Sequence, residues 1–302
     1  MKRIVLTDGG MGQEVLRRSG AAPTPLWSAR VLIDEPDLVR DLHADFIDAG
    51  ARVITINTYA ATPERLEREG VGELFEELQQ RGIDLAKQAR DMTGADVRIA
   101  GCLPPLFGSY KPELTLSFDE TLAIYRRIAA EQKDRVDLML CETMASAEEG
   151  LAAATAAAES GLPVWISWTL QDSLDGARLR SGETIADAAR AIAHIKTEAR
   201  MINCSKPEVI SAGMDDLIAL GGPVGAYANG FTSIGALKHG GTVDVLEARR
   251  DLGPESYADF AESWAAKGAS IVGGCCEVGP KHIAALRDRL LKNGFELTGT
   301  PQ

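Results

Sequence analysis

Eight short runs rich in β-forming residues alternate with longer helical stretches, and this alternation restricts the fold more than any other feature. The runs are residues 4–7, 53–57, 97–101, 138–141, 164–169, 201–203, 224–228 and 270–273. Strands that alternate with helices are typical of a parallel sheet covered by helices. Eight such units predict an α/β fold, a single (β/α)8 TIM barrel, for which the chain of 302 residues is long enough.

A doubly wound open sheet is the alternative fold with the same alternation of strands and helices. The barrel is favoured because the strand count is eight and no glycine fingerprint of a dinucleotide site stands out in the sequence. We expect residues 1–292 to form this one barrel domain. Residues 293–302 are expected to form a short C-terminal tail.

Several helix beginnings carry recognisable signals. Ser117 with Glu120, and Ser146 with Glu149, have the spacing of a capping box. Three prolines stand where a first helical turn would begin: Pro36, Pro207 and Pro280.

The charge balance argues against nucleic acid and against anionic membranes as primary partners. The formal net charge is −12, so the chain would repel phosphate groups. No apolar run is long enough to span a bilayer, and the N-terminus reaches Asp8 too soon for a signal-peptide core. Five cysteines are an odd and sparse set that does not fit a disulfide framework. We therefore expect a cytoplasmic protein whose partners are small molecules, with the oligomeric state left open.

Polar and sulfur residues gather where the predicted strands end. Active sites of these barrels lie at the C-terminal ends of the strands, so these residues are the first candidates for function. They include Asp8, Gly9, Gly10, Tyr59, Cys102, Glu142, Cys204, Asn229, Cys275 and Cys276.

Three of the five cysteines are candidate metal ligands. Cys204 ends the sixth strand, and Cys275 and Cys276 end the eighth, so only one strand separates them. Three thiolates suit Zn²⁺, and three protein ligands leave a fourth position open, which is typical of a catalytic zinc site. A disulfide between Cys275 and Cys276 would be strained. We interpret Cys102 and Cys141 as small buried hydrophobes, with Cys141 facing the helix layer.

A zinc ion with three thiolates carries a formal charge of −1, which makes it a poor electrophile. Such an ion can instead hold a substrate thiol as thiolate, although a free thiol with a pKa of about 8.5 is mostly protonated at neutral pH. Alkyl transfer to that sulfur would give a thioether, a weaker ligand that can leave. The residues therefore predict thiol alkylation as the reaction class.

Two carboxylates at the same rim suggest what carries the thiol. Asp8 and Glu142 both end strands and could bind an ammonium group, and they are the candidate catalytic pair. The backbone N–H groups of Gly9 and Gly10 could approach a carboxylate closely. An ordinary turn at residues 8–10 and a structural ion pair at Glu142 are the alternatives. Together with the cysteines, these residues point to an amino acid that bears a thiol.

At this point the chain resembles the homocysteine S-methyltransferases, a family that includes S-methylmethionine-dependent enzymes, betaine–homocysteine methyltransferase and the homocysteine-binding barrel of cobalamin-dependent methionine synthase. The resemblance covers nearly the whole chain. The matching segments are Asp8-Gly9-Gly10-Met11-Gly12, Leu26-Trp27-Ser28-Ala29, Thr58-Tyr59-Ala60-Ala61-Thr62-Pro63, Cys141-Glu142-Thr143, Asn203-Cys204 and Gly273-Gly274-Cys275-Cys276.

The resemblance implies a TIM barrel, one zinc ion and homocysteine as the methyl acceptor. By this resemblance, Cys204, Cys275 and Cys276 correspond to the zinc ligands. Asp8 and Glu142 correspond to the acidic residues that bind the amino group of homocysteine. Gly9 and Gly10 match the glycine turn near the substrate carboxylate, and Tyr59 is expected to line the donor side.

The segment that should face the methyl donor departs from the family pattern. It is Tyr227-Ala228-Asn229-Gly230-Phe231, where S-methylmethionine-type members would have Pro-Asn-Ser-Gly-Glu. Asn229 remains, as a candidate substrate-binding residue, but the proline and the glutamate do not. S-methylmethionine, S-adenosylmethionine, betaine and dimethylsulfoniopropionate therefore all stay open as donors. Trp27 or Trp168 could contact an onium donor through cation–π attraction, and His239 could border the site.

Four other functions remain as alternatives. One is a non-catalytic zinc- or thiol-binding module, and another is a subunit that presents homocysteine to a corrinoid protein. A third is a methyltransferase that acts on another small thiol. The last is a metal-free lyase or aldolase with a lysine Schiff base, for which Lys206 is the candidate.

Overall fold

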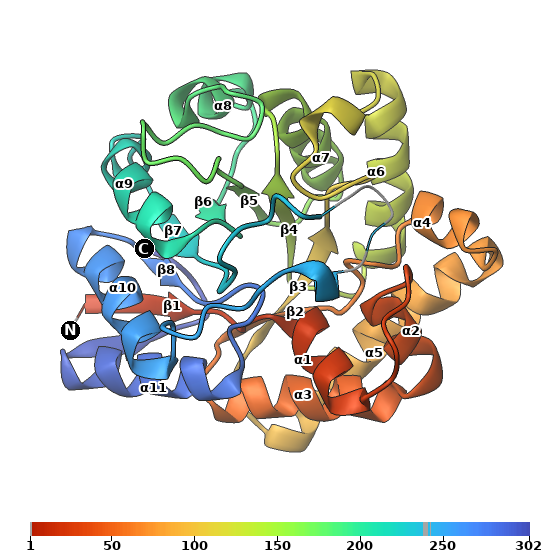
Figure 1. Ribbon diagram of the computed structural model, residues 1–302, viewed down its shortest axis with the longest axis horizontal. Helices are drawn as coiled ribbons and strands as arrows, with labels where there is room; N and C mark the ends of the chain where they lie inside the picture. Colours follow the sequence, from red (N-terminus) through yellow and green to blue (C-terminus); the bar gives the residue numbers. More distant parts are fainter. Residues whose placement is uncertain (1, 238–240, 242) are drawn as a thin grey trace.

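A curled sheet of nine strands forms the centre of the structure, with helices around it (Figure 1). The computed structural model describes residues 2–237, 241 and 243–302. In chain order the strands are β1 (Lys2–Leu6), β2 (Val53–Thr55), β3 (Arg98–Leu103), β4 (Leu138–Met144), β5 (Val164–Trp168), β6 (Ala199–Asn203), β7 (Val224–Tyr227), β8 (Ile271–Val272) and β9 (Phe295–Leu297). All the paired strands are parallel, and their order is β2-β3-β4-β5-β6-β7-β8-β1-β9. The fold is therefore TIM-barrel-like, and the predicted parallel α/β sheet is confirmed.

Strand β1 also makes a limited contact with β2, which stands at the other end of the strand order. A single parallel bridge joins Thr7 to Val53 there. The Arg52 N–H donates to the Leu6 carbonyl at 2.7 Å, and the Asp8 N–H donates to the Val53 carbonyl at 3.1 Å. The contact between β1 and β2 is thus one bridge with two flanking hydrogen bonds, whereas the other neighbours share longer ladders.

Helices surround the sheet and connect its strands (Figure 1). None of the helices in the described ranges is long and apolar enough to cross a membrane. They are α1 (Met11–Ser19), α2 (Ser28–Asp34), α3 (Pro36–Asp48), α4 (Pro63–Arg68), α5 (Phe75–Thr93), α6 (Phe118–Gln132), α7 (Ala147–Glu159), α8 (Ile185–Ala191), α9 (Pro207–Ile218), α10 (Pro254–Lys267) and α11 (Pro280–Lys292), with 3₁₀ turns η1 (Gly72–Leu74), η2 (Pro112–Leu114) and η3 (Val243–Val245).

Local sequence signals set several of these helix boundaries. The three predicted prolines each occupy the first position of a helix, in α3, α9 and α11. The capping box of Ser117 and Glu120 is present at α6. At α7 only half of the predicted box forms, because Ser146 Oγ accepts from the Glu149 N–H at 3.1 Å while the Glu149 carboxylate accepts from the Ala145 N–H at 2.8 Å. Glu149 therefore caps one residue further upstream than the sequence pattern indicates.

Alternation along the strands divides the core into two layers. The inner cluster consists of Val5, Val53, Ala100, Leu138, Leu140, Trp165, Ala199, Met201, Tyr227 and Ile271, which together come from all of β1 to β8. The other side of the sheet packs against the helices in a larger cluster. Cys141 belongs to that outer cluster and its neighbour Leu140 to the inner one, as the sequence predicts.

The C-terminal segment extends the sheet instead of forming only a tail. Strand β9 pairs with β1, with Lys2 opposite Phe295. Arg98 Nη1 donates to the Gly299 carbonyl at 3.1 Å and to Glu198 Oε2 at 2.9 Å. The sequence analysis did not predict this strand, because three residues are too few to show a pattern of alternation.

The inner cluster leaves no room for a side chain at Gly225 of β7. A Cβ added there would lie 2.6 Å from Ile271 Cβ and 2.7 Å from the Ile271 carbonyl oxygen. We predict that Gly225→Ala lowers the free energy of unfolding in urea by about 1–3 kcal/mol, the usual cost of overpacking. Gly235→Ala is the control, since its Cβ would meet only Ser233 Oγ, at 3.4 Å. Equal losses in both variants would contradict the prediction.

Candidate active site

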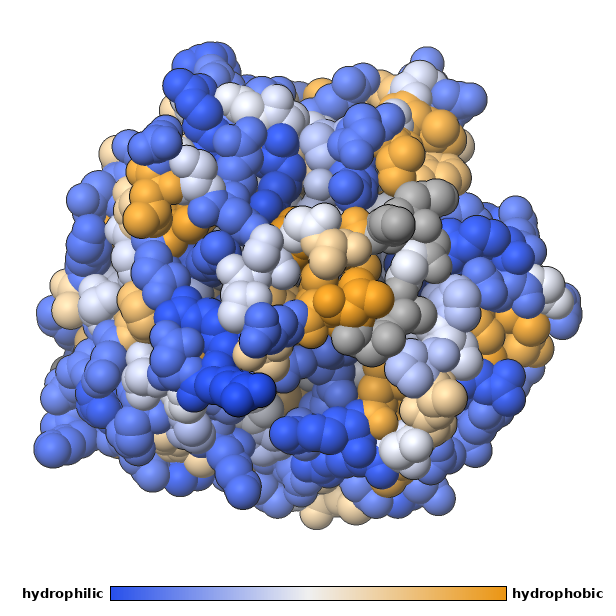
Figure 2. Space-filling view, in the orientation of Figure 1, coloured by the Kyte–Doolittle hydropathy of each residue, from blue (hydrophilic) through white to orange (hydrophobic). Residues whose placement is uncertain are grey.

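A pocket lies at the C-terminal ends of the strands, where the sequence places the site. Its lining includes most of the predicted site residues: Asp8, Gly9, Gly10, Tyr59, Glu142, Cys204, Cys275 and Cys276. The β7–α10 connection, which contains η3, crosses over this end of the sheet in Figure 1, and Figure 2 shows an apolar patch at the same place. Leu237 and Val243 of this connection also line the pocket. Two apolar side chains of this connection thus form part of the wall of the pocket that holds the chemistry-bearing side chains.

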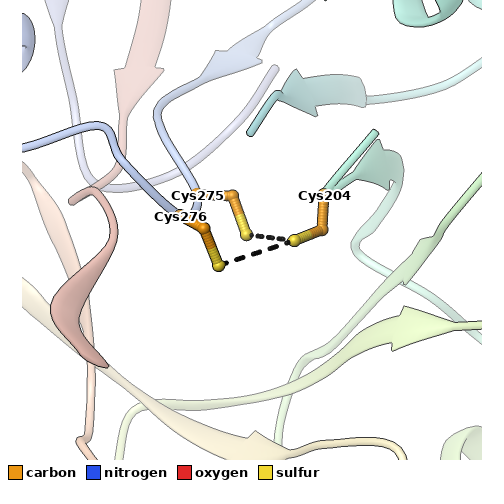
Figure 3. A group of neighbouring side chains, drawn as sticks. All are labelled: Cys204, Cys275 and Cys276. Atoms are coloured by element: carbon orange, nitrogen blue, oxygen red, sulfur yellow. Dashed lines mark hydrogen bonds between the residues drawn. The ribbon is translucent and has the colours of Figure 1, made fainter. Parts of the chain in front are cut away.

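The three predicted metal ligands all line this pocket. Their sulfurs point toward one another (Figure 3). Their sulfurs all lie within 4.8 Å of one another. The Sγ of Cys204 is 2.8 Å from that of Cys275 and 3.9 Å from that of Cys276. Zn–S bonds of about 2.3 Å in a tetrahedron place the sulfurs about 3.8 Å apart. A small outward movement of Cys275 would therefore give a set of donors that fits Zn²⁺.

Backbone hydrogen bonds to the end of β7 position two of these cysteines. The Cys204 N–H donates to the Tyr227 carbonyl at 3.0 Å, and the Cys275 N–H donates to the Ala228 carbonyl at 2.9 Å. Both cysteines are thus tied to the strand end that separates them. Cys204 also has a φ of 46°, which is unfavourable for a residue with a side chain. Such strain is typical of functional positions held by the surrounding structure.

The glycine turn after β1 lets two loops approach each other closely. A Cβ on Gly9 would lie 2.0 Å from the Val278 carbonyl oxygen, and one on Gly10 would lie 2.5 Å from the Cys275 carbonyl oxygen. Glycine is therefore required here to seat the loop that carries Cys275. The Gly10 N–H donates to the Val278 carbonyl at 2.8 Å, so this amide already has a partner within the protein.

Two further side chains donate toward the Cys204 sulfur. The Tyr110 hydroxyl lies 2.9 Å from Cys204 Sγ, and Asn229 Nδ2 lies 4.0 Å from it on the buried side. Burial opposes ionisation of Cys204, but hydrogen bonds from the neighbouring thiols and from Tyr110 lower its pKa well below the usual value. Burial, followed by the charge of Cys204, raises the pKa of Tyr110, which keeps the phenol neutral as a donor. One sulfur of the cluster is thus stabilised as a thiolate.

The two predicted carboxylates lie in the same pocket and are both expensive to ionise. Asp8 Oδ2 accepts from the Thr55 N–H at 2.7 Å, and Glu142 Oε1 accepts from the Cys102 thiol at 3.2 Å. Burial raises the pKa of Asp8 to about 8, with a further contribution from the charge of Glu142. Burial also raises the pKa of Glu142 to about 7. A cation bound between them would favour both ionised forms.

A buried amide connects the strand ends that carry Glu142 and Cys204. Asn203 Oδ1 accepts from the Thr143 N–H at 3.0 Å and from Ser167 Oγ at 2.8 Å, and Asn203 Nδ2 donates to Thr143 Oγ1 at 2.9 Å. Thr143 has a φ of 64°, so its backbone conformation is also held by this network. Glu142 and Cys204 are consequently fixed relative to each other.

Two aromatic side chains, Tyr59 and Trp27, also line the pocket. The rings of Tyr59 and Trp27 are T-shaped, with centroids 5.8 Å apart. The Tyr59 hydroxyl lies 2.8 Å from Ser109 Oγ, and Trp27 Nε1 donates to Gln13 Oε1 at 3.1 Å. Trp27 is therefore placed to meet a ligand, whereas the fully buried Trp168 belongs to the outer cluster and does not line the pocket.

Some of the predicted residues lie outside the pocket lining. Asn229 is buried behind Cys204 and accepts from the Phe231 N–H at 3.2 Å, so it supports the loop from within. Lys206, the candidate for a Schiff base, is the N-cap of α9 and does not line the pocket. His239 lies outside the described residues.

The sequence analysis did not predict two contacts in this site, one of Tyr110 and one of Cys102. Tyr110 stands in the long connection after β3 and has a φ of 66°, a conformation that the residue type does not signal. Cys102 is buried as predicted, but its thiol also donates to Glu142. Only the packing of loops from different strands reveals these two contacts.

Comparison with known proteins agrees with this geometry. The family model of the homocysteine S-methyltransferases matches residues 5–290. The chain belongs to the homocysteine S-methyltransferase family. It is 30% identical to the homocysteine S-methyltransferase of Escherichia coli (strain K12), with 95% of each chain covered. It is 29% identical to the selenocysteine methyltransferase of Astragalus bisulcatus, with 97% of this chain and 94% of that one covered.

The solved structure of a related protein agrees with this family assignment. The metallated form of the homocysteine methyltransferase MmuM from Escherichia coli superposes with a TM-score of 0.80 at 29% identity. The match covers 95% of this chain and 96% of that chain. The similarity therefore includes the strands and loops that carry the pocket.

The sulfur cluster gives a first prediction about metal binding. Cys204→Ala should reduce bound zinc from about one ion per reduced chain to about one tenth or less, because two thiolates and water hold the ion much more weakly. Cys141→Ala is the matched control, since Cys141 is equally buried but faces the helices. Metal analysis after dialysis against a weak chelator measures both. Retention of zinc by the Cys204 variant would contradict this assignment.

The raised pKa of Asp8 predicts how stability depends on pH. The folded protein keeps a proton on Asp8 up to about pH 8, whereas the unfolded chain releases it near pH 3.8. The contribution of this group to stability is therefore fully present below about pH 4 and is lost as the pH rises toward 8. Asp8→Asn should remove this loss, which amounts to at most about 1.4 kcal/mol for each pH unit in between.

Urea unfolding of metal-free, substrate-free protein at pH 5, 6.5 and 8 tests this. The difference between Asp8→Asn and the parent should shift in favour of the variant as the pH rises. Asp216→Asn, at an exposed position of α9, provides the control. Parallel pH curves for the Asp8 variant and the parent would refute the burial argument.

Proposed function

We propose that this family member transfers a methyl group from a sulfonium or quaternary ammonium donor to the thiol of homocysteine, giving methionine. The observation that carries the proposal is the meeting of three cysteine sulfurs with two carboxylates in one pocket. The sulfur cluster suits a thiol, and the carboxylates suit an ammonium group. Homocysteine carries both groups on one small molecule.

Zn²⁺ is the proposed metal, held by Cys204, Cys275 and Cys276. The fit rests on three sulfurs within 4.8 Å of one another and on the softness of thiolate donors. Bound there, zinc would lower the pKa of the acceptor thiol and so keep its sulfur available as a nucleophile. Tyr110 and Asn229 orient the Cys204 sulfur from the protein side.

Asp8 and Glu142 are proposed to bind the ammonium group of the acceptor. Burial makes both carboxyl groups costly to ionise. A bound ammonium group would stabilise their ionised forms and be stabilised by them. The Cys102 thiol keeps Glu142 oriented, and the Thr55 N–H keeps Asp8 oriented. The Gly9 amide is the proposed contact for the acceptor carboxylate, because the Gly10 amide is bonded to Val278.

Methyl transfer itself needs little from the protein beyond placement. The donor C–S or C–N bond breaks and leaves its electron pair on the donor heteroatom, while a new C–S bond forms to the acceptor thiolate. The acceptor thiol proton goes to solvent, and the donor becomes a neutral thioether or tertiary amine. Holding both reactants in line supplies much of the acceleration. Tyr59 and Trp27 offer aromatic faces to the onium cation.

We further propose that residues 1–292 form a closed (β/α)8 barrel. The inner cluster draws on eight strands, and the Thr7–Val53 bridge joins β1 to β2. The free thiols of the proposed site require a reducing compartment such as the cytoplasm.

Purified, zinc-loaded and reduced protein provides the test. It should convert homocysteine to methionine with at least one of the four donors named above. Glu142→Gln should raise the KM for homocysteine about 10- to 100-fold, because it removes a charged partner of the ammonium group. The KM for the methyl donor should change much less. No methionine with any donor, from protein that holds zinc, would contradict the proposal.

The same assay separates the alternatives. A non-catalytic or corrinoid-partnered subunit would bind homocysteine without turnover on small donors. Another acceptor is favoured by one specific observation, the similarity to a relative named for selenocysteine. Cysteine and selenocysteine should therefore be assayed beside homocysteine, and a higher kcat/KM for either would identify the acceptor.

A further inference from the structure

One arginine in the pocket has no role in the chemistry described above. Arg65 lies on α4, six residues after Tyr59, and its side chain lines the pocket. It is half-buried. Burial lowers the pKa of Arg65, which reflects the cost of keeping a charge there, although a guanidinium stays charged at neutral pH.

The other cations at this rim of the pocket are neutralised by the protein. Arg68 Nε lies 3.0 Å from Glu69 Oε1, and Lys111 Nζ lies 3.9 Å from Glu113 Oε1. In the described ranges, by contrast, no carboxylate lies within 4.0 Å of an Arg65 nitrogen, and no side-chain hydrogen bond involves Arg65. This holds even for the adjacent Glu64, whose pKa is raised by its own burial. Arg65 is thus a cation without a carboxylate partner among the described residues.

Neutral hydroxyl groups line the same pocket as Arg65. The Tyr59 hydroxyl and Ser109 Oγ are 2.8 Å apart. Burial raises the pKa of Tyr59 well above its usual value, so the phenol remains a donor. A planar guanidinium with nearby O–H donors matches a carboxylate, which arginine binds in a bidentate manner.

We propose that Arg65 binds the carboxylate of the methyl donor and so discriminates between donors that carry a carboxylate and donors that do not. This inference rests on the proposed function. The acceptor has proposed ionic partners in Asp8, Glu142 and the sulfur cluster. Arg65 instead lines the same pocket as Tyr59 and Trp27, the proposed aromatic contacts of the onium group. The aromatic rings thus bind the cationic end of the donor, and Arg65 binds its anionic end.

This arrangement has a kinetic consequence. Methyl transfer removes the charge of the onium centre but leaves the carboxylate unchanged. Arg65 therefore binds substrate, transition state and product about equally. An interaction of this kind lowers KM without raising kcat. Arg65 acts as a specificity residue for the donor.

The test compares two sulfonium donors that differ in the carboxylate. Dimethylsulfoniopropionate carries one, and trimethylsulfonium does not. Arg65→Gln should lower kcat/KM for dimethylsulfoniopropionate about 10- to 100-fold, mainly through KM, which corresponds to about 1.4–2.7 kcal/mol. Activity with trimethylsulfonium and the KM for homocysteine should stay within about twofold. Arg68→Gln is the control, because that arginine on the same helix is paired with Glu69.

Three outcomes would overturn the inference. They are equal losses with both donors, a raised KM for homocysteine with an unchanged KM for the donor, and no change at all. Calorimetric titration with dimethylsulfoniopropionate separates this inference from the proposed function, because binding needs no turnover. Binding that is lost in Arg65→Gln supports the carboxylate site even if the parent protein does not methylate homocysteine. Equal binding by parent and variant refutes the site even if the parent is fully active.

Discussion

The parallel register of β6, β7 and β8 is the constraint on which the rest of the site depends. Asn203, the last residue of β6, lies opposite Tyr227, and Ala226 lies opposite Val272. The chain segments that follow β6 and β8 are therefore level, and both bond to the end of β7. A shift by one residue would turn the side chains to the opposite face of the sheet. The three sulfurs meet only because this register holds.

Electrostatics give the pocket its selectivity. Burial makes Asp8 and Glu142 costly to ionise, and the sulfur cluster adds further negative charge to the same enclosed space. Such a site favours ligands that bring a positive charge. The rim differs, because Arg65 contributes a positive charge that no described carboxylate neutralises. The pocket thus combines acidic groups at the strand ends with a cation on α4, a combination that suits zwitterionic ligands.

The loops of the site contain both required glycines and non-glycine residues with a positive φ. Gly9 and Gly10 are required because carbonyl groups of the β8–α11 loop lie where their Cβ atoms would be. Cys204, Thr143 and Tyr110 instead tolerate a positive φ, each held by hydrogen bonds from its surroundings. The loops that bear the site are consequently fixed by contacts among themselves, and the strands fix where those loops begin.

The sequence by itself determined the features that depend on neighbours along the chain. Alternation predicted the parallel strands, and prolines predicted the beginnings of three helices. Most of the candidate residues chosen at the strand ends line the pocket. Only the tertiary structure decided the contacts between loops: the half-formed cap at Ser146, the short strand β9, the hydrogen bonds of Tyr110 and Cys102, and the unpaired charge of Arg65. Periodicity and capping depend on residues that are close together in the chain, so they can be recognised directly in the sequence. The distance between side chains on separate loops depends instead on how all the strands and helices pack, and no local pattern encodes it.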